Sequence, residues 1–326
     1  MDAARPVAVE VADRYGHFAR DEAPGRSALY AEWAAGVASD PPVAALLGRI
    51  AAAHRQPPLV FAVTRMLGAP EASYRAWAEW VLAHAEAVVA ECAARSLQTN
   101  EPLRCAALLP ALSGIDGPIA LLEIGASAGL CLYPDRYSYR YRGGPDLDPA
   151  AGVSPVVLES ALVGDPALRI PEILWRGGID LAPLNAADAD DRRFLTSLVW
   201  PGEEGRRRRI EAALDVVAAD PPVLVRGDAT ERGVLELLAR QAPPDATLVI
   251  TTPGVLPHIP RAGRDLLIAH IADLDAVWIS IDPPGLALDG VTPVDSAWTR
   301  FVLRRNGTAL AAVDPLGGFV EWRRED

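Results

Sequence analysis

The residues best placed to do chemistry lie in the segment Leu121–Leu130, where an apolar run ends at an acidic side chain and a row of small residues. Glu123 is followed by Gly125, Ser127 and Gly129 at intervals of two. Small residues let a ligand approach the backbone closely, and a helix that starts at such a turn offers unpaired N–H groups. The pattern therefore predicts a ligand site at the end of a strand, with Glu123 facing the ligand.

This segment resembles motif I of the Rossmann-like S-adenosylmethionine-dependent methyltransferases, Glu-x-Gly-x-Gly-x-Gly, with Ser127 in place of the middle glycine. In that family the turn holds the methionine and ribose portion of the cofactor. The resemblance implies S-adenosylmethionine as cofactor, with Glu123, Gly125, Ser127 and Gly129 binding it, and methylation of a small polar acceptor as the activity. The spacing departs from the GxGxxG pattern, so NAD or FAD suits it less well.

The same residues, 125–129, also spell GxSxG, the nucleophile elbow of α/β-hydrolases. On this alternative Ser127 is the nucleophile, and Asp228 with His258 or His270 follows in the required order. Such an elbow normally follows several strands, whereas only helices are expected upstream here. We therefore favour the methyltransferase-like interpretation. A third alternative is a non-catalytic binding module of the same fold, in which the turn takes no cofactor.

Acidic side chains also follow the next two expected strands. Asp180 ends a second strand, where an acid can bind ribose hydroxyls, although it can equally start a turn. Asp135 is a rival for the ribose. Asp228 and Ala229 follow a third strand, where the carboxylate can accept from an adenine amino group and Ala229 offers a backbone N–H. Asp228 can equally cap the next helix.

Polar residues that suit a substrate occur at two places. Thr251 and Thr252 follow a fourth strand, which faces the substrate in such folds. Upstream, Asn100, Glu101 and Arg104 begin an apolar helix, and Arg104 can hold a carboxylate or phosphate through two hydrogen bonds. A helix cap and a surface salt bridge are the alternative for these three residues.

Candidates for a catalytic acid or base are few. His258 follows the fourth strand, and a histidine side chain suits proton transfer at neutral pH. Glu101 is the other candidate. We expect the Tyr137–Tyr141 segment to close over the cofactor pocket together with the residues around Glu101.

Composition bounds the class of protein. The chain has 326 residues, half of them apolar, and a net charge of −12, so a basic nucleic-acid footprint is absent. No apolar run approaches the ~20 residues of a membrane span, and the start of the chain does not have the pattern of a signal peptide. Three widely spaced Cys argue against a disulfide scaffold or a metal site. We expect a cytoplasmic protein with a small-molecule substrate and no nucleic-acid or membrane partner.

Hydrophobic periodicity predicts an α/β fold: a helical part over residues 1–115, then a Rossmann-like domain over 116–326. That domain has a mostly parallel sheet with helices on both faces, a C-terminal antiparallel hairpin, and an inserted lid at about 132–171. Expected helices cover 28–38, 43–53, 71–95, 102–112, 206–218, 230–240 and 261–272. Expected strands cover 119–124, 223–225, 247–251, 277–281, 301–305, 308–313 and 319–322.

Four segments resemble a bacterial family catalogued as domain of unknown function 2332. They are QTNEPLRCAALLPAL from Gln98, LLEIGASAGLCLYPDRYSY from Leu121, WRGGIDLAPLN from Trp175 and LVWPGEEGRRRRIEAAL from Leu198. The resemblance covers nearly the whole chain. It implies a fold similar to that of the methyltransferases and leaves the activity open.

Overall fold

The computed structural model describes residues 6–288, 291, 294 and 298–323. The chain divides into two compact units, each continuous in space but not in sequence. The helical unit comprises Met1–Thr99 and Asp188–Glu211, and the sheet unit comprises Asn100–Ala187 and Ala212–Asp326. This division differs from the expected one at residue 115, because helix α7 (Arg104–Ser113) packs on strands of the sheet and belongs with them.

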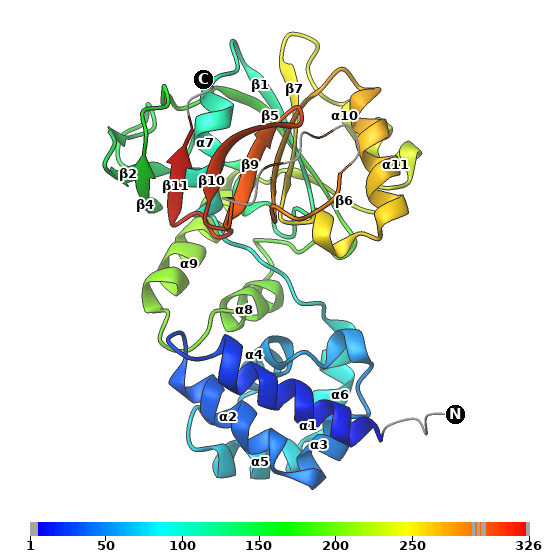
Figure 1. Ribbon diagram of the computed structural model, residues 1–326. Coiled ribbons are helices and arrows are strands. Elements are labelled where there is room, and N and C mark those ends of the chain that lie inside the picture. Colours follow the sequence, from blue (N-terminus) through cyan, green and yellow to red (C-terminus); the bar gives the residue numbers. More distant parts are fainter. Residues whose placement is uncertain (1–5, 289–290, 292–293, 295–297, 324–326) are drawn as a thin grey trace. The chain divides into compact units, whose positions relative to one another are not determined.

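The helical unit is built around buried aromatic side chains. Its helices are α1 (Val7–His17), α2 (Ala28–Ala38), α3 (Pro41–Leu47), α4 (Pro57–Met66), α5 (Tyr74–Ala83), α6 (Ala85–Ala94), α8 (Ala189–Ser197) and the start of α9 (Glu204–Ala219) (Figure 1). Trp33 stacks on Trp77 with ring centroids 5.2 Å apart, and Phe61 meets both rings edge-on. Because these rings come from α2, α4 and α5, the cluster joins helices that are distant in sequence.

The expected helix over 71–95 is two helices in the structure. His84 separates α5 from α6, with φ −114° and ψ 26°, outside the helical region. The ring of His84 stacks on Trp80 at 4.1 Å and contacts its carbonyl oxygen. The apolar spacing continues across the break, which is why periodicity alone did not reveal it.

The strands of the sheet unit form one mixed sheet with more parallel than antiparallel neighbours. Among the described residues its order is β3-β2-β4-β11-β10-β9-β8-β7-β1-β5-β6. The parallel strands around the glycine turn are β1 (Ile119–Ile124), β5 (Ile173–Asp180), β6 (Val223–Arg226), β7 (Thr247–Pro253) and β8 (Val277–Asp282). Helices α10 (Arg232–Ala239) and α11 (Arg261–Ala272) connect β6 to β7 and β7 to β8 (Figure 1).

The C-terminal strands confirm the expected hairpin. Strands β9 (Phe301–Arg305) and β10 (Thr308–Val313) pair antiparallel across Asn306 and Gly307. Both turn residues have positive φ, 49° and 81°, as a type I′ turn requires. Strand β11 (Phe319–Trp322) then pairs antiparallel with β10.

Residues 132–171, expected as a lid, contribute strands instead. Strands β2 (Ser138–Arg142), β3 (Asp146–Leu147) and β4 (Val157–Val163) extend the sheet beyond β11. The side chains of Tyr137, Tyr139 and Tyr141 are buried, and their hydroxyls donate to backbone carbonyl oxygens. These tyrosines therefore anchor the extension rather than close over a ligand.

The strand register separates two faces at the carboxyl ends of β1, β7 and β8. Glu123 is aligned with Thr251, so these side chains share one face. Trp278 is aligned with Ile250 and lies on the other face, in an apolar cluster that includes side chains of α10 and α11. Since side chains alternate along a strand, Ser280 and Asp282 share the face of Trp278.

Candidate functional site

The glycine turn follows β1 as expected, but it does not open an α-helix. Gly125, Ser127 and Gly129 have φ values of 77°, 53° and 78°. A positive φ is ordinary for glycine and uncommon for serine. After Gly129 the chain forms a 3-10 turn, Leu130–Leu132, and then enters the segment that leads to β2. The expected helix N-terminus with unpaired N–H groups is therefore wrong.

Every backbone N–H of the turn already has an acceptor within the protein. Those of Gly125 and Ala126 donate to the carbonyl oxygen of Ile179, at 2.8 and 3.2 Å, and that of Gly129 donates to Ala126. The N–H of Ser127 donates to Asp180 Oδ2 at 2.8 Å. The remaining N–H, from Ala128, donates to the side chain of Asn100 at 3.3 Å. The turn thus has no N–H left to bind an anionic group.

Side chains of the protein also fill the space above two of the glycines. A Cβ at Gly125 would lie 2.8 Å from Val255 Cγ2, and one at Gly129 would lie 3.0 Å from Pro222 Cγ. Together with the positive φ of both residues, these contacts explain why glycine occupies positions 125 and 129 even without a ligand.

Glu123, the acidic residue just before the turn, is the side chain whose hydrogen bonding is incomplete. It is 3 % exposed, and Oε2 has no hydrogen-bond partner among the described residues. Burial raises the pKa of this carboxyl well above its ordinary value, and the positive charge of Arg104 opposes the shift. A buried carboxylate oxygen without a partner is costly, so Glu123 Oε2 is the strongest pointer to a ligand at this edge of the sheet.

The structure brings the upstream polar segment to the glycine turn. Asn100 Nδ2 donates to Ser127 Oγ, and its Oδ1 accepts from the turn backbone. Glu101 is buried, its side chain accepts from the N–H of Leu103 at 3.0 Å, and its carbonyl oxygen accepts from Cys131 Sγ. Arg104 donates to the carbonyl oxygen of Pro253 at the end of β7, at 3.0 Å. In the part of the chain that the structure describes, no side chain caps the start of α7, and Asn100 and Glu101 are buried, so the alternative of a helix cap and a surface salt bridge does not describe these contacts.

The three acids proposed to bind the cofactor have different surroundings. Asp180 ends β5, and its two oxygens accept from the N–H groups of Ser127 and Ala182. Asp135, the rival for a ribose, pairs with Arg176 at 2.6 Å. Asp228 is exposed and accepts from the N–H and hydroxyl of Thr230 in the turn before α10, whose N-cap residue is Glu231, so it does not cap that helix. Asp180 is thus the acid that lies next to the turn.

The other candidates lie around the same strands. Thr251 and Thr252 are buried in β7, and Thr252 Oγ1 accepts from Trp278 Nε1 at 3.0 Å. Ala229 is buried after β6. His258 is exposed in the 3-10 turn Leu256–His258, after β7. His270, named for the hydrolase alternative, lies in the last turn of α11.

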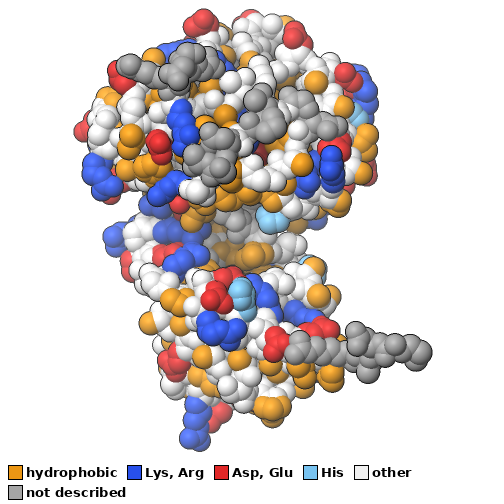
Figure 2. Space-filling model, viewed as in Figure 1, with side chains coloured by type: hydrophobic (Ala, Val, Ile, Leu, Met, Phe, Trp, Pro, Cys, Tyr) orange, Lys and Arg blue, Asp and Glu red, His pale blue; other side chains and the backbone are white. Residues whose placement is uncertain are grey.

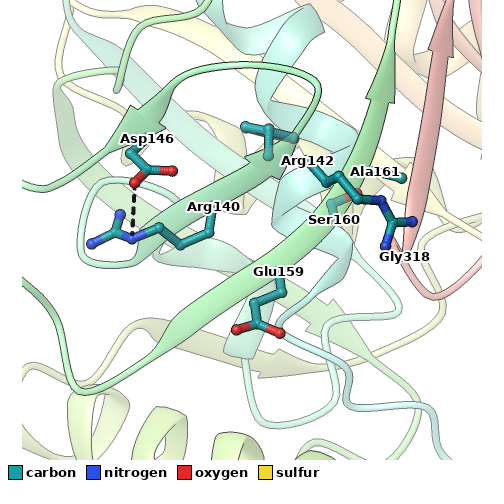
Figure 3. Close-up of a pocket in the computed structure, with 8 residues that line it drawn as sticks. Arg140, Arg142, Asp146, Glu159, Ser160, Ala161 and Gly318 are labelled. Carbon is teal, nitrogen blue, oxygen red and sulfur yellow. Dashed lines mark ion pairs between the residues drawn. The ribbon is translucent and has the colours of Figure 1, made fainter.

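A pocket of about 460 Å³ lies elsewhere, on the strands that extend the sheet (Figure 3). Arg140 and Arg142 from β2 and Glu159 from β4 line it, together with Asp146, which pairs with Arg140 at 3.7 Å. Tyr141, from the expected lid, also lines this pocket, but none of the predicted cofactor-binding, substrate-binding or catalytic residues does. On the outer surface of each unit, in the view of Figure 2, basic side chains are interspersed with acidic ones. In the described part of the chain no helix has the length and apolar character to cross a membrane.

A buried polar cluster on the opposite face of the sheet was missed by the sequence analysis. Asp282 ends β8, is fully buried, and neither carboxylate oxygen has a hydrogen-bond partner among the described residues. Arg304 on β9 is 2 % exposed, and Nε and Nη1 likewise lack partners. The rule that singled out Asp180, an acid at a strand end, applies to Asp282 too, but the expected strand ended at residue 281. Arg304 lies within a hairpin strand, and nothing in its local sequence marks it as a site residue.

Asp282 should make the stability of the protein depend on pH. Burial raises its pKa from 3.8 to about 6, against the opposing effects of the Ser280 hydroxyl and of the positive charges of Arg304 and Arg264. The folded state then binds the proton more tightly than the unfolded state. The free energy of unfolding should therefore fall by up to about 3 kcal/mol as pH rises from 4 to 7. Denaturation curves of the wild type and of Asp282→Asn, measured from pH 4 to 7, test this expectation. The free energy of unfolding should fall with pH in the wild type relative to the variant, and parallel pH profiles of the two proteins would contradict it.

The chain matches a known protein family. A family model described as "Uncharacterized protein conserved in bacteria (DUF2332)" matches residues 12–322. No curated protein and no solved structure matches the chain.

Proposed function

Because the chain belongs to this bacterial family, DUF2332, which is described only as uncharacterized, we infer its function from the site itself. We propose that the sheet unit binds S-adenosylmethionine or a similar adenosyl ligand beside Glu123 and methylates a small polar acceptor. The observation that carries this proposal is Glu123 Oε2, a buried carboxylate oxygen without a partner among the described residues. Buried polar groups in proteins are nearly always hydrogen-bonded, so a donor from a ligand is the partner this oxygen lacks.

The order of the parallel strands supports a Rossmann-like interpretation. Numbered along the chain, β6-β5-β1-β7-β8 have the order 3-2-1-4-5. In such sheets ligands bind beyond the carboxyl ends of the strands, where the strand order reverses. That point lies between β1 and β7, next to Glu123.

The chemistry of the turn favours an adenosyl ligand over a nucleotide with phosphates. Since all N–H groups of residues 125–129 donate within the protein, a phosphate would find no backbone donors there. Glu123 and Asp180 offer carboxylate oxygens, which accept from hydroxyl or ammonium groups. S-adenosylmethionine carries both and no phosphate, and when bound it supplies an activated methyl group. Asn100 and Arg104 contact the turn and the end of β7, and we propose that they and Glu101 form the side of the site that meets the acceptor.

Isothermal titration of the full chain with S-adenosylmethionine and S-adenosylhomocysteine tests the proposal. Saturable binding is expected, and Glu123→Gln should weaken it at least tenfold. A hydrogen bond to a charged group contributes about 1.5–3 kcal/mol, and each 1.4 kcal/mol is a factor of about ten. Glu159→Gln, which changes an exposed Glu on β4, should bind as the wild type does.

No heat and no thermal shift at millimolar ligand would overturn the proposal. The second candidate function, a non-catalytic binding module, would then stand. It is favoured by the side chains of Val255 and Pro222, which fill the space above Gly125 and Gly129. For the hydrolase alternative, loss of fluorophosphonate labelling in Ser127→Ala would be the decisive result.

A further inference from the structure

We propose that the buried cluster on the α11 face of the sheet is a second binding site, which takes a small zwitterion with an ammonium and a carboxylate group, as in a free α-amino acid. Its members are Ser280 and Asp282 on β8, Arg304 on β9 and Arg264 on α11. This inference does not depend on the proposed adenosyl site, since Glu123 lies on the other face.

The strand pairing brings the opposite charges together. Ser280 is directly opposite Arg304, and Asp282 is opposite Val302, so Asp282 and Arg304 are diagonal neighbours on one face. Diagonal neighbours in an antiparallel pair are within reach of long side chains. The positive charges of Arg304 and Arg264 both act on the Asp282 carboxylate, which places Arg264 near it from the helix side.

The charges are close but do not satisfy one another. Asp282 Oδ1 and Oδ2, Ser280 Oγ, Arg304 Nε and Nη1, and Arg264 Nε are buried without hydrogen-bond partners among the described residues. Elsewhere in the same unit, Asp135 and Arg176 form a direct ion pair at 2.6 Å with both side chains largely buried. A buried carboxylate and guanidinium that make no such pair are each left short of a hydrogen-bond partner, which a bound polar molecule would supply.

The set of unsatisfied groups defines the ligand. Asp282 supplies two acceptors that suit an ammonium group, and the arginines supply donors that suit a carboxylate. An anion alone would satisfy Arg264 and Arg304 but would be repelled by Asp282. A cation alone would pair with Asp282 but would be repelled by Arg264 and Arg304. A molecule that carries both groups satisfies both sides of the cluster.

Thermal unfolding of the full chain in the presence of common α-amino acids, tested one at a time, examines this site. At least one should raise the midpoint in a saturable way, while methylammonium chloride and sodium acetate at matched ionic strength should not. Asp282→Asn and Arg304→Gln should each weaken binding at least tenfold. Glu159→Gln and Glu123→Gln should leave it unchanged, which separates this site from the adenosyl site.

If Asp282→Asn or Arg304→Gln does not fold, two further measurements still test the site. Ser280→Ala removes one hydroxyl and should weaken amino-acid binding severalfold in a folded protein. A crystal structure with the bound amino acid should show its ammonium at Asp282 and its carboxylate at Arg304. Ordered water alone at these atoms, or equal shifts from methylammonium or acetate, would overturn the proposal.

Discussion

Replacing Gly317 with alanine should lower the free energy of unfolding of the sheet unit by about 4 kcal/mol, because the new Cβ has no room. Gly317 lies in the turn between β10 and β11 with φ +94°, and a Cβ there would overlap the carbonyl group of Leu103. The obstacle is backbone, so a change of rotamer cannot relieve it. Arg104, the next residue, donates to the carbonyl oxygen of Pro315 in the same turn at 2.9 Å.

Gly152→Ala is the matched control for this variant. Gly152 has φ +100°, yet a Cβ there would meet nothing within 4 Å. It should therefore cost only the strain of the left-handed backbone, about 1–2 kcal/mol. Chemical denaturation followed by circular dichroism measures both variants. Equal losses would show that the contact between the turn and Leu103 does not matter. If Gly317→Ala folds, it should also weaken adenosyl-ligand binding, since it displaces the segment that holds Arg104.

Replacing Trp77 with alanine should destabilise the helical unit by about 3–5 kcal/mol. Trp77 is fully buried, stacks on Trp33, and its Nε1 donates to Thr64 Oγ1 at 3.0 Å. Removing the indole leaves a cavity among aromatic rings that are held by other helices and cannot close over it.

Trp80→Ala on the same helix provides the comparison. Trp80 is half-buried and stacks on His84, so its loss should cost less than about 1 kcal/mol. Guanidinium denaturation of both variants, followed by helical circular dichroism, gives the difference. Similar losses for Trp77 and Trp80 would contradict the assignment of the aromatic cluster as the core of this unit.

The strands and the turns with strong local preferences could be predicted from the sequence. The expected strand at Ile119–Ile124, the helix at Arg261–Ala272 and the hairpin through Asn306 and Gly307 have the same bounds in the structure. In each of these, local chemistry and the tertiary structure favour the same conformation. The break at His84 could not be predicted, because the apolar stripe passes through it.

The features that depend on distant contacts could not be predicted. The Tyr-rich sequence of residues 137–141 suggests a lid. In the structure the tyrosine rings are buried in the sheet extension, and this burial depends on contacts with residues that are distant in sequence. For the candidate site, the spacing singled out Glu123, Asp180 and the segment that holds Asn100, and the structure places Asn100 and Asp180 at the glycine turn. The spacing could not show that Asn100 and Asp180 occupy the N–H groups of the turn. Arg304 and Asp282 are also far apart in the chain, and only the pairing of β8 with β9 brings them together.

The discontinuous helical unit constrains how the protein can form during synthesis on the ribosome. Arg65 Nη1 donates to the carbonyl oxygens of Ser197 and Val199, at 2.9 and 2.8 Å, and Trp200 packs on Phe18 and Tyr30. The first helices therefore lack part of their core until residues up to Glu211 have been translated. At ~5–20 residues per second this delay is on the order of ten seconds. During that interval Phe18 and Tyr30 lack their contacts with Trp200, and this part of the aromatic core stays open.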